Sequence, residues 1–199
     1  MEKWNIGWGP VSKCNMNCKF CYSRHRRTGC GDLGLSEWKS FVDGNYERIA
    51  TINYGTGENA MDPDWFELIA YVRERYPGIR QALTTNGFLA PAVASNLSRR
   101  TAFLNSIDEV DVSLDFYDKN RHCDLRGQPM AYDWALETLR LCKQAGKPTT
   151  IVFIGSAVNL IDENIDGLFS IAEEYDAILR MNLFRPTQGV DGKSREFIA

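Results

Sequence analysis

The sequence has no apolar run that approaches the roughly 20 residues a helix needs to cross a membrane. Its first residues, MEKWNIGWGP, also lack the long apolar stretch of a signal peptide. Charge of one sign is not in excess either, because the formal net charge is only −3, which creates no global field that would attract nucleic acid. We therefore expect a cytoplasmic protein with neither a membrane nor a nucleic acid as its partner.

Cysteine is present but unevenly distributed. Six cysteines could form three disulfides, yet a chain of this length without a secretory signal does not need such covalent staples. Three of them, Cys14, Cys18 and Cys21, lie within one short segment, whereas Cys30, Cys123 and Cys142 are scattered. This distribution is typical of a metal site accompanied by ordinary thiols.

Strand-like and helix-like segments alternate along the chain. Runs rich in β-branched or continuous apolar residues predict strands, and amphipathic runs with end signals such as Pro63 and Gly146 predict helices. The expected strands are 4–9, 51–54, 81–87, 109–116, 148–156 and 177–184, and the expected helices are 35–50, 62–76, 90–104, 132–146 and 164–176. This alternation predicts an α/β fold with a parallel sheet and right-handed crossovers.

The chain has no internal linker that would mark a domain boundary, so we expect one core domain over residues 1–199. After the last expected strand a closing helix should follow, but GVDGKSREFIA is too short to form a convincing one. Two explanations stay open. Either the core is truncated at its C-terminus, or a partner chain or missing C-terminal segment covers that flank.

The three clustered cysteines follow a C-x3-C-x2-C pattern. Thiolates from compact loops hold iron–sulfur clusters, and three of them bind three irons of a [4Fe–4S] cluster while leaving the fourth iron open to another ligand. Structural zinc is the alternative, but it prefers four ligands, and Cys30 or His25 would have to supply the fourth.

With Phe20 directly before the third cysteine, this segment resembles the signature of the radical S-adenosylmethionine (SAM) superfamily. The resemblance implies a partial (βα)6 barrel, the radical SAM core, with a [4Fe–4S] cluster on Cys14, Cys18 and Cys21. It also implies that SAM chelates the open iron and is cleaved to methionine and a 5′-deoxyadenosyl radical, which abstracts a substrate hydrogen. The backbone at Phe20 is expected to touch the adenine.

The end of the second strand resembles the family's Gly-Gly-Glu run, which hydrogen-bonds the amino group of SAM. Here the run is Thr56-Gly57-Glu58, so Thr replaces the first Gly, and Asn59 stands where many members have Pro. Gly57 permits close backbone approach, and Glu58 can accept from an ammonium group. We therefore expect Thr56, Gly57 and Glu58 to bind SAM.

The fourth strand and the segment after it resemble radical SAM modifiers of peptides and proteins, including the sulfatase-maturating type. By that resemblance Ser113 and Arg126 contact the ribose and carboxylate of SAM, and a planar guanidinium suits a carboxylate. Asp115 contacts the ribose or the substrate, or else caps a turn.

Three further positions are weaker candidates. Asn159 and Leu183 follow or end later strands, where family members place adenine contacts. Cys123, beside His122, is a candidate catalytic residue that would donate hydrogen to a substrate radical. The basic run at residues 23–27 is either a solvated loop or a dock for an acidic flavodoxin, a ferredoxin or a substrate carboxylate.

The resemblance makes a ribosomally made precursor peptide the leading substrate, although the sequence shows no auxiliary-cluster domain of the kind that many peptide modifiers carry. A radical SAM step on a small molecule, in cofactor or natural-product biosynthesis, is the first alternative. A non-enzymatic iron–sulfur or zinc protein is the second.

Overall fold

The computed structural model describes residues 2–23 and 32–185 and contains one six-stranded sheet. Neighbouring strands pair in parallel and in sequence order throughout. The strands are β1 (Trp4–Trp8), β2 (Ile49–Tyr54), β3 (Arg80–Thr85), β4 (Glu109–Ser113), β5 (Thr149–Gly155) and β6 (Ile178–Leu183). The predicted parallel α/β fold is therefore confirmed. Because β1 and β6 each pair with one strand in the described part, the barrel is partial.

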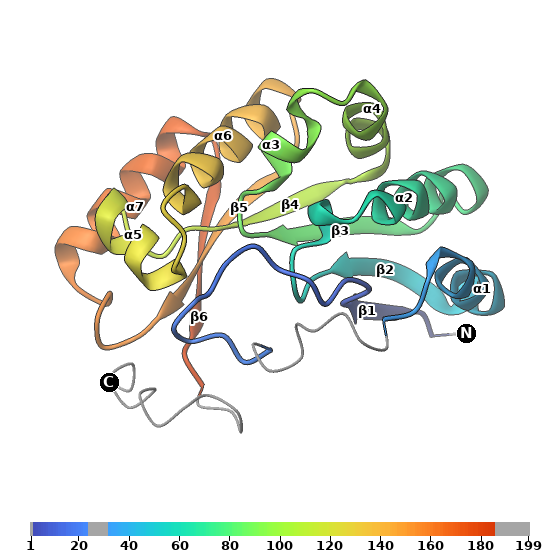
Figure 1. Cartoon of the computed structure of the whole chain (residues 1–199), viewed down its shortest axis with the longest axis horizontal. Helices are drawn as coiled ribbons and strands as arrows, with labels where there is room; N and C mark the ends of the chain where they lie inside the picture. Colours follow the sequence, from blue (N-terminus) through green and yellow to red (C-terminus); the bar gives the residue numbers. More distant parts are fainter. Residues whose placement is uncertain (1, 24–31, 186–199) are drawn as a thin grey trace.

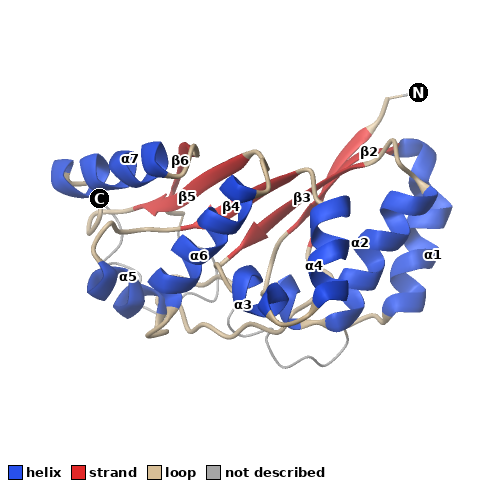
Figure 2. Cartoon of the chain, turned by 90° about the horizontal axis from the view of Figure 1, so that it is seen from above, coloured by secondary structure: helices blue, strands red, loops and turns tan. Residues whose placement is uncertain are grey.

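Seven α-helices and two short 3₁₀ helices connect the described strands. They are α1 (Leu35–Asn45), η2 (Tyr46–Arg48), η3 (Asn59–Met61), α2 (Pro63–Arg75), α3 (Leu89–Ala94), α4 (Leu97–Ser106), α5 (Lys119–Arg126), α6 (Ala131–Gln144) and α7 (Asp162–Glu174). Figure 1 shows α2, α3, α4 and α6 above the sheet and the segment after β1 passing below it. In Figure 2 the helices α1, α2 and α6 run alongside the sheet.

Three predicted helices match the structure to within two residues at each end, and two differ more. The helix expected at 35–50 ends at Asn45, because Ile49 already belongs to β2. The helix expected at 90–104 is interrupted near Asn96, whose side-chain oxygen accepts a hydrogen bond from the Arg99 amide at 3.0 Å and so caps α4.

Helix α5 was not expected from the sequence. Its segment, KNRHCDLR, has almost no apolar residues to reveal a helical period. Asp118 caps the first turn by accepting from the Arg121 amide at 2.8 Å, and Gly127 ends the helix with a left-handed φ of 60°. Local end signals, rather than an apolar stripe, therefore define this helix.

The core lies between the sheet and the helices packed on it. Ile52 of β2, Leu83 of β3 and Val112 of β4 are fully buried, as are Trp65 of α2 and Phe103 of α4. None of the helices in residues 2–23 and 32–185 is both long and apolar enough to cross a membrane. Since every strand is parallel, the carboxyl ends of all six meet at one edge, where α/β folds place their sites.

Candidate active site at the carboxyl ends of the strands

A cavity of about 210 Å³ lies at this edge of the sheet. Eight of the predicted site residues line it: Cys14, Cys18, Phe20, Cys21, Thr56, Gly57, Ser113 and Arg126. The other eight lining residues are Tyr22, Ser23, Thr84, Thr85, Asn86, Val152, Ile154 and Asn182. The structure therefore brings the cysteine segment, the Thr56–Gly57 turn and the ends of later strands around one space.

The cysteine segment is held against the turn that follows β2. The Glu58 amide donates to the Lys13 carbonyl at 2.8 Å. Gly57 has a φ of 66°, and a Cβ at this position would lie 2.3 Å from the Val11 carbonyl oxygen. Only glycine allows this approach, so Gly57 lets its turn lie close to the segment that leads to the cysteines, and its predicted contact with SAM stays a prediction.

The same segment is held a second time, by the end of α5. The amides of Asn17 and Lys19 donate to the carbonyls of Arg126 and Leu125, both at 3.0 Å. These carbonyls belong to the last turn of the helix, which leaves them without partners inside the helix. Helix α5 thus fixes the segment between Cys14 and Cys21 at a second place along the chain.

Each cysteine thiol of the trio lies near a polar group that can stabilise a thiolate. The Asn86 side-chain amide lies 3.7 Å from Cys14 Sγ, and Arg126 Nη1 lies 4.0 Å from Cys18 Sγ. Cys21 Sγ lies 3.4 Å from the Ser23 hydroxyl. Within residues 2–23 and 32–185, no three His, Cys, Asp or Glu side chains converge on one ion-sized point. Three cysteine thiols that line one cavity are nevertheless the kind of donor set that holds an iron–sulfur cluster.

Glu58 is fully buried and does not line the cavity. Its carboxylate accepts hydrogen bonds from the Asn86 amide at 2.7 Å, the Thr85 hydroxyl at 3.0 Å and the Ala60 amide at 3.3 Å. Burial raises the pKa of Glu58 to about 7, and these three donors only partly oppose the shift. The carboxylate therefore acts on the cavity through Thr85 and Asn86, which do line it.

Asp115, also fully buried, is paired with a cation. Its carboxylate accepts from Arg126 Nε at 2.6 Å and from the Ile154 amide at 2.9 Å. Burial opposes the charged form of Arg126, but Asp115 and then Cys18 favour it more strongly, and the net effect raises the pKa of Arg126. Asp115 thus holds Arg126 at the cavity wall.

His122 supports Asp115 from behind. Its Nδ1 accepts a hydrogen bond from the Asp115 amide at 3.1 Å. Burial lowers the pKa of His122 to about 4, so the ring is neutral at pH 7. The 3.9 Å separation between His122 Nδ1 and the Asp115 carboxylate is therefore not an ion pair.

Besides Glu58 and Asp115, three more predicted residues do not line the cavity. Asn159 is buried and joins the ends of β4 and β5, because its side-chain amide donates to the carbonyls of Asp115 at 3.3 Å and Ile154 at 2.9 Å. Leu183 is 62% exposed, and its neighbour Asn182 lines the cavity instead. The Cys123 thiol donates to the Pro129 carbonyl at 3.1 Å. Their predicted roles in adenine contact and hydrogen donation stay predictions.

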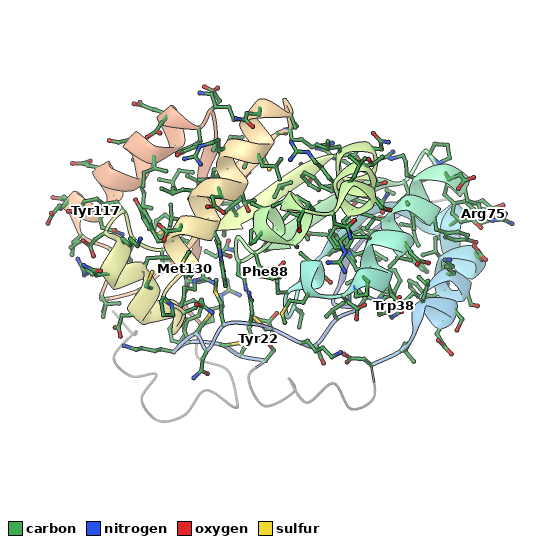
Figure 3. The ribbon with its side chains drawn as sticks, turned by 45° about the horizontal axis from the view of Figure 1, so that its top comes forward. Tyr22, Trp38, Arg75, Phe88, Tyr117 and Met130 are labelled. Atoms are coloured by element: carbon green, nitrogen blue, oxygen red, sulfur yellow. The ribbon has the colours of Figure 1, made fainter. Side chains whose placement is uncertain are left out.

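Thr56 carries backbone strain at the cavity. Its φ of 67° lies in the left-handed region, which a β-branched residue rarely adopts. Its hydroxyl lies 3.1 Å from the hydroxyl of Tyr22, a residue of the segment after β1 that is labelled in Figure 3. The threonine that replaces a family glycine is therefore strained and bonded to the cysteine segment.

Three of the cavity residues that the sequence analysis did not identify could have been found from their position in the sequence. Thr84, Thr85 and Asn86 are consecutive polar residues at the end of an expected strand, in QALTTNG. Their position should have marked them as cavity residues. Two further candidates, Cys30 and His25, lie outside the described residues, as does the basic run beyond Ser23.

Residues 9–172 match the radical SAM superfamily. The chain belongs to the radical SAM superfamily. The family uses a [4Fe–4S] cluster and SAM, so the prediction of these cofactors is confirmed. The match also favours a cluster over zinc at the cysteine trio.

The radical SAM chain is 29% identical over 198 residues to an AdoMet-dependent heme synthase of Methanosarcina barkeri, covering 96% of this chain and 53% of that protein. It is also 29% identical over 193 residues to the mycofactocin maturase MftC of Mycobacterium tuberculosis, covering 94% of this chain and 46% of that protein. The chain therefore spans about half the length of these relatives.

Among solved structures, SuiB of Streptococcus suis bound to S-adenosylmethionine is similar with a TM-score of 0.79 and 18% identity, covering 100% of this chain and 43% of that one. SuiB bound to its precursor peptide SuiA gives the same TM-score over 95% of this chain and 41% of that one. This likeness confirms the partial barrel of the radical SAM core.

Proposed function

We propose that this chain is the core of a radical SAM enzyme in which Cys14, Cys18 and Cys21 hold three irons of a [4Fe–4S] cluster and SAM binds in the adjoining cavity. The observation that carries this proposal is that all three cysteines line one cavity together with Thr56, Gly57, Ser113 and Arg126. Held by these cysteines, a reduced cluster would supply one electron for cleavage of the S–C5′ bond of SAM, which would give methionine and a 5′-deoxyadenosyl radical able to take a hydrogen atom from the substrate.

The chain's own residues bind and orient. The Arg126 guanidinium, fixed by Asp115, suits the carboxylate of SAM. Thr56 and Gly57 bring backbone to the cavity, and Ser113 contributes a hydroxyl for the ribose. Ionised Glu58 is hydrogen-bonded to Thr85 and Asn86 of the cavity wall, and its negative charge attracts the positive charge of SAM. Val152 and Ile154 form an apolar wall that helps to exclude water.

A ribosomally made precursor peptide is the substrate class we favour. Two similar proteins support it, since MftC is named a maturase and SuiB has been solved with a precursor peptide. A small molecule is the second candidate, because the heme synthase of Methanosarcina barkeri shares the same 29% identity with this chain as MftC does. We further propose a single core domain over residues 1–199, a cytoplasmic location, and a flavodoxin or ferredoxin as electron donor.

The test uses the chain purified and reconstituted with iron and sulfide without oxygen. With SAM and dithionite it should form 5′-deoxyadenosine, and a cognate peptide should raise that rate. A peptide deuterated at the reacting carbon should transfer its label to 5′-deoxyadenosine. If no 5′-deoxyadenosine forms, the proposed activity is wrong. If a small molecule stimulates turnover and transfers its label while peptides do not, the second candidate replaces the first.

A further inference from the structure

Arg126 has one contact that binding of SAM does not require. Besides its ion pair with Asp115, its Nη1 reaches Cys18 Sγ at 4.0 Å, and its guanidinium carbon lies 5.1 Å from the centre of the Phe20 ring. Arg126 is only 7% exposed. A guanidinium keeps its charge in every protein environment, so a fixed positive charge lies beside a thiolate expected to bind iron.

The position of this charge is determined from several directions. Asp115 grips Nε at 2.6 Å, and the Asp115 carboxylate is itself fixed by the Ile154 amide at 2.9 Å. Asn17 is the residue before Cys18, and its amide donates a hydrogen bond to the Arg126 backbone carbonyl at 3.0 Å. The same residue therefore positions the cysteine segment through its backbone and faces the thiol with its side chain.

The ion pair presents its two charges to Cys18 in a definite order. The guanidinium contacts the sulfur, and Asp115 contacts the guanidinium through the other nitrogen, Nε. The pair is therefore a dipole with its positive end at the thiolate. In a buried place such a dipole is weakly screened, and hydrogen bonds and charges at the sulfur ligands are among the factors that set cluster potentials.

We propose that Arg126, oriented by Asp115, is a positioning residue that raises the reduction potential of the [4Fe–4S] cluster through the Cys18 thiolate. This inference rests on the proposed function, because it requires a cluster on the cysteine trio. The step is the transfer of one electron from an external one-electron donor to the cluster, with no bond formed or broken. Since reduction adds one negative charge, a nearby positive charge stabilises the reduced state.

The experiment measures the midpoint potential of the reconstituted chain by redox titration followed with electron paramagnetic resonance. SAM is left out, so that any loss of SAM binding cannot alter the result. The variants are Arg126→Gln and the double variant Asp115→Asn/Arg126→Gln. The matched control is Arg121→Gln, which removes an arginine from the same helix. Arg121 instead donates to the Val158 carbonyl at 2.8 Å and lies over Phe116.

The potential should become more negative in Arg126→Gln, which leaves Asp115 uncompensated. It should be less negative in the double variant than in Arg126→Gln, yet still below wild type, because the whole dipole is gone. The control should shift much less than either. The double variant also removes both buried charges together, which proteins tolerate better than removing one, so it serves if Arg126→Gln does not fold.

Equal potentials in wild type and the double variant would overturn the inference. Failure of the double variant to hold a cluster would also overturn it, because Arg126 would then act in assembly and not on the potential. A wild-type chain that takes up no [4Fe–4S] cluster is a different result, since it contradicts the proposed function itself.

Discussion

Glu58 and Asp115 are two fully buried carboxylates that follow the ends of β2 and β4, but their surroundings differ. Asp115 is paired with Arg126 at 2.6 Å and accepts from the Ile154 amide. Glu58 accepts from three donors without charge, the Asn86 and Ala60 amides and the Thr85 hydroxyl. One negative charge is therefore offset inside the protein, and the other is hydrogen-bonded but not offset.

This difference separates the two carboxylates by task. A buried charge without a counterion is costly, and burial accordingly raises the pKa of Glu58 to about 7. A cation bound in the adjoining cavity would lower that cost. SAM carries both an ammonium and a sulfonium group, so Glu58 is the carboxylate suited to respond to the cofactor. Asp115 is suited to hold Arg126.

The largest expected effect comes from breaking the compensated pair. Asp115→Asn leaves the Arg126 charge buried without its partner, and it should lower the free energy of unfolding by about 3–5 kcal/mol. Urea unfolding of the iron-free chain measures this. Asp124→Asn is the control, because Asp124 lies on the same helix as Arg126 and forms an exposed ion pair with Lys19, whose loss should cost about 1 kcal/mol or less. Similar small losses in both variants would mean that Asp115 is not the partner on which Arg126 depends.

The uncompensated carboxylate should make stability depend on pH. The pKa of Glu58 is 4.5 in the unfolded chain and about 7 in the folded chain. Between pH 4.5 and pH 7, the folded chain therefore keeps the Glu58 proton and the unfolded chain loses it. Protonated Glu58 therefore contributes fully to the free energy of unfolding below about pH 4.5, and this contribution, about 3 kcal/mol, is lost as pH rises through about 7.

The check is to measure urea unfolding of wild type and Glu58→Gln from pH 4.5 to pH 8 and to take the difference. The glutamine side chain cannot ionise. The free energy of unfolding of the variant should therefore rise relative to that of wild type as pH increases, and it should be the larger of the two at pH 8. A difference that does not change with pH would show that Glu58 is not the uncompensated group.

SAM affinity should respond to the same ionisation. Because charged Glu58 favours a cation in the cavity, binding should strengthen as pH rises through about 7. At pH 8, Glu58→Gln should bind SAM about tenfold more weakly, or roughly 1.4 kcal/mol. Calorimetry of both proteins across this range separates the effect of Glu58 from the ionisation of SAM itself, which both share. Parallel pH profiles would remove Glu58 from the account of SAM binding.

The smallest expected effect lies in the turn that carries Glu58. Thr56→Gly should raise the free energy of unfolding by about 1 kcal/mol, because the left-handed φ of 67° suits glycine and strains threonine. The lost hydroxyl contact with Tyr22 makes the gain modest. Thr101→Gly inside α4 is the control and should lower stability slightly. A loss of stability in Thr56→Gly would mean that the Tyr22 contact outweighs the strain.

The strands could be predicted from the sequence because each is a distinct apolar or β-branched run, and all six were found in order. Helix α5 could not, since its eight residues show no apolar period and its ends depend on Asp118 and Gly127. That helix supplies both the carbonyls that hold the cysteine segment and the Arg126 side chain. The local spacing of residues does not reveal such long-range contacts.

In the site, too, the sequence indicated where backbone segments lie better than which contacts their side chains make. The cysteines, Gly57, Ser113 and Arg126 were selected from the sequence and line one cavity in the structure, because motif and strand end together determine where their backbone lies. The direction of a side chain was harder to predict. Glu58 turns toward Thr85 and Asn86, and Asn159 joins two strand ends, since each satisfies buried polar groups that the sequence does not place together.

The most direct test of the cysteine assignment is the iron content and SAM cleavage of Cys18→Ala beside Cys142→Ala after the same anaerobic reconstitution. Cys18 lines the cavity, whereas Cys142 is buried in α6 among apolar residues. The account predicts that Cys18→Ala loses the cluster absorbance and forms no 5′-deoxyadenosine, while Cys142→Ala keeps both. A Cys18→Ala protein with full iron content and undiminished SAM cleavage would contradict it.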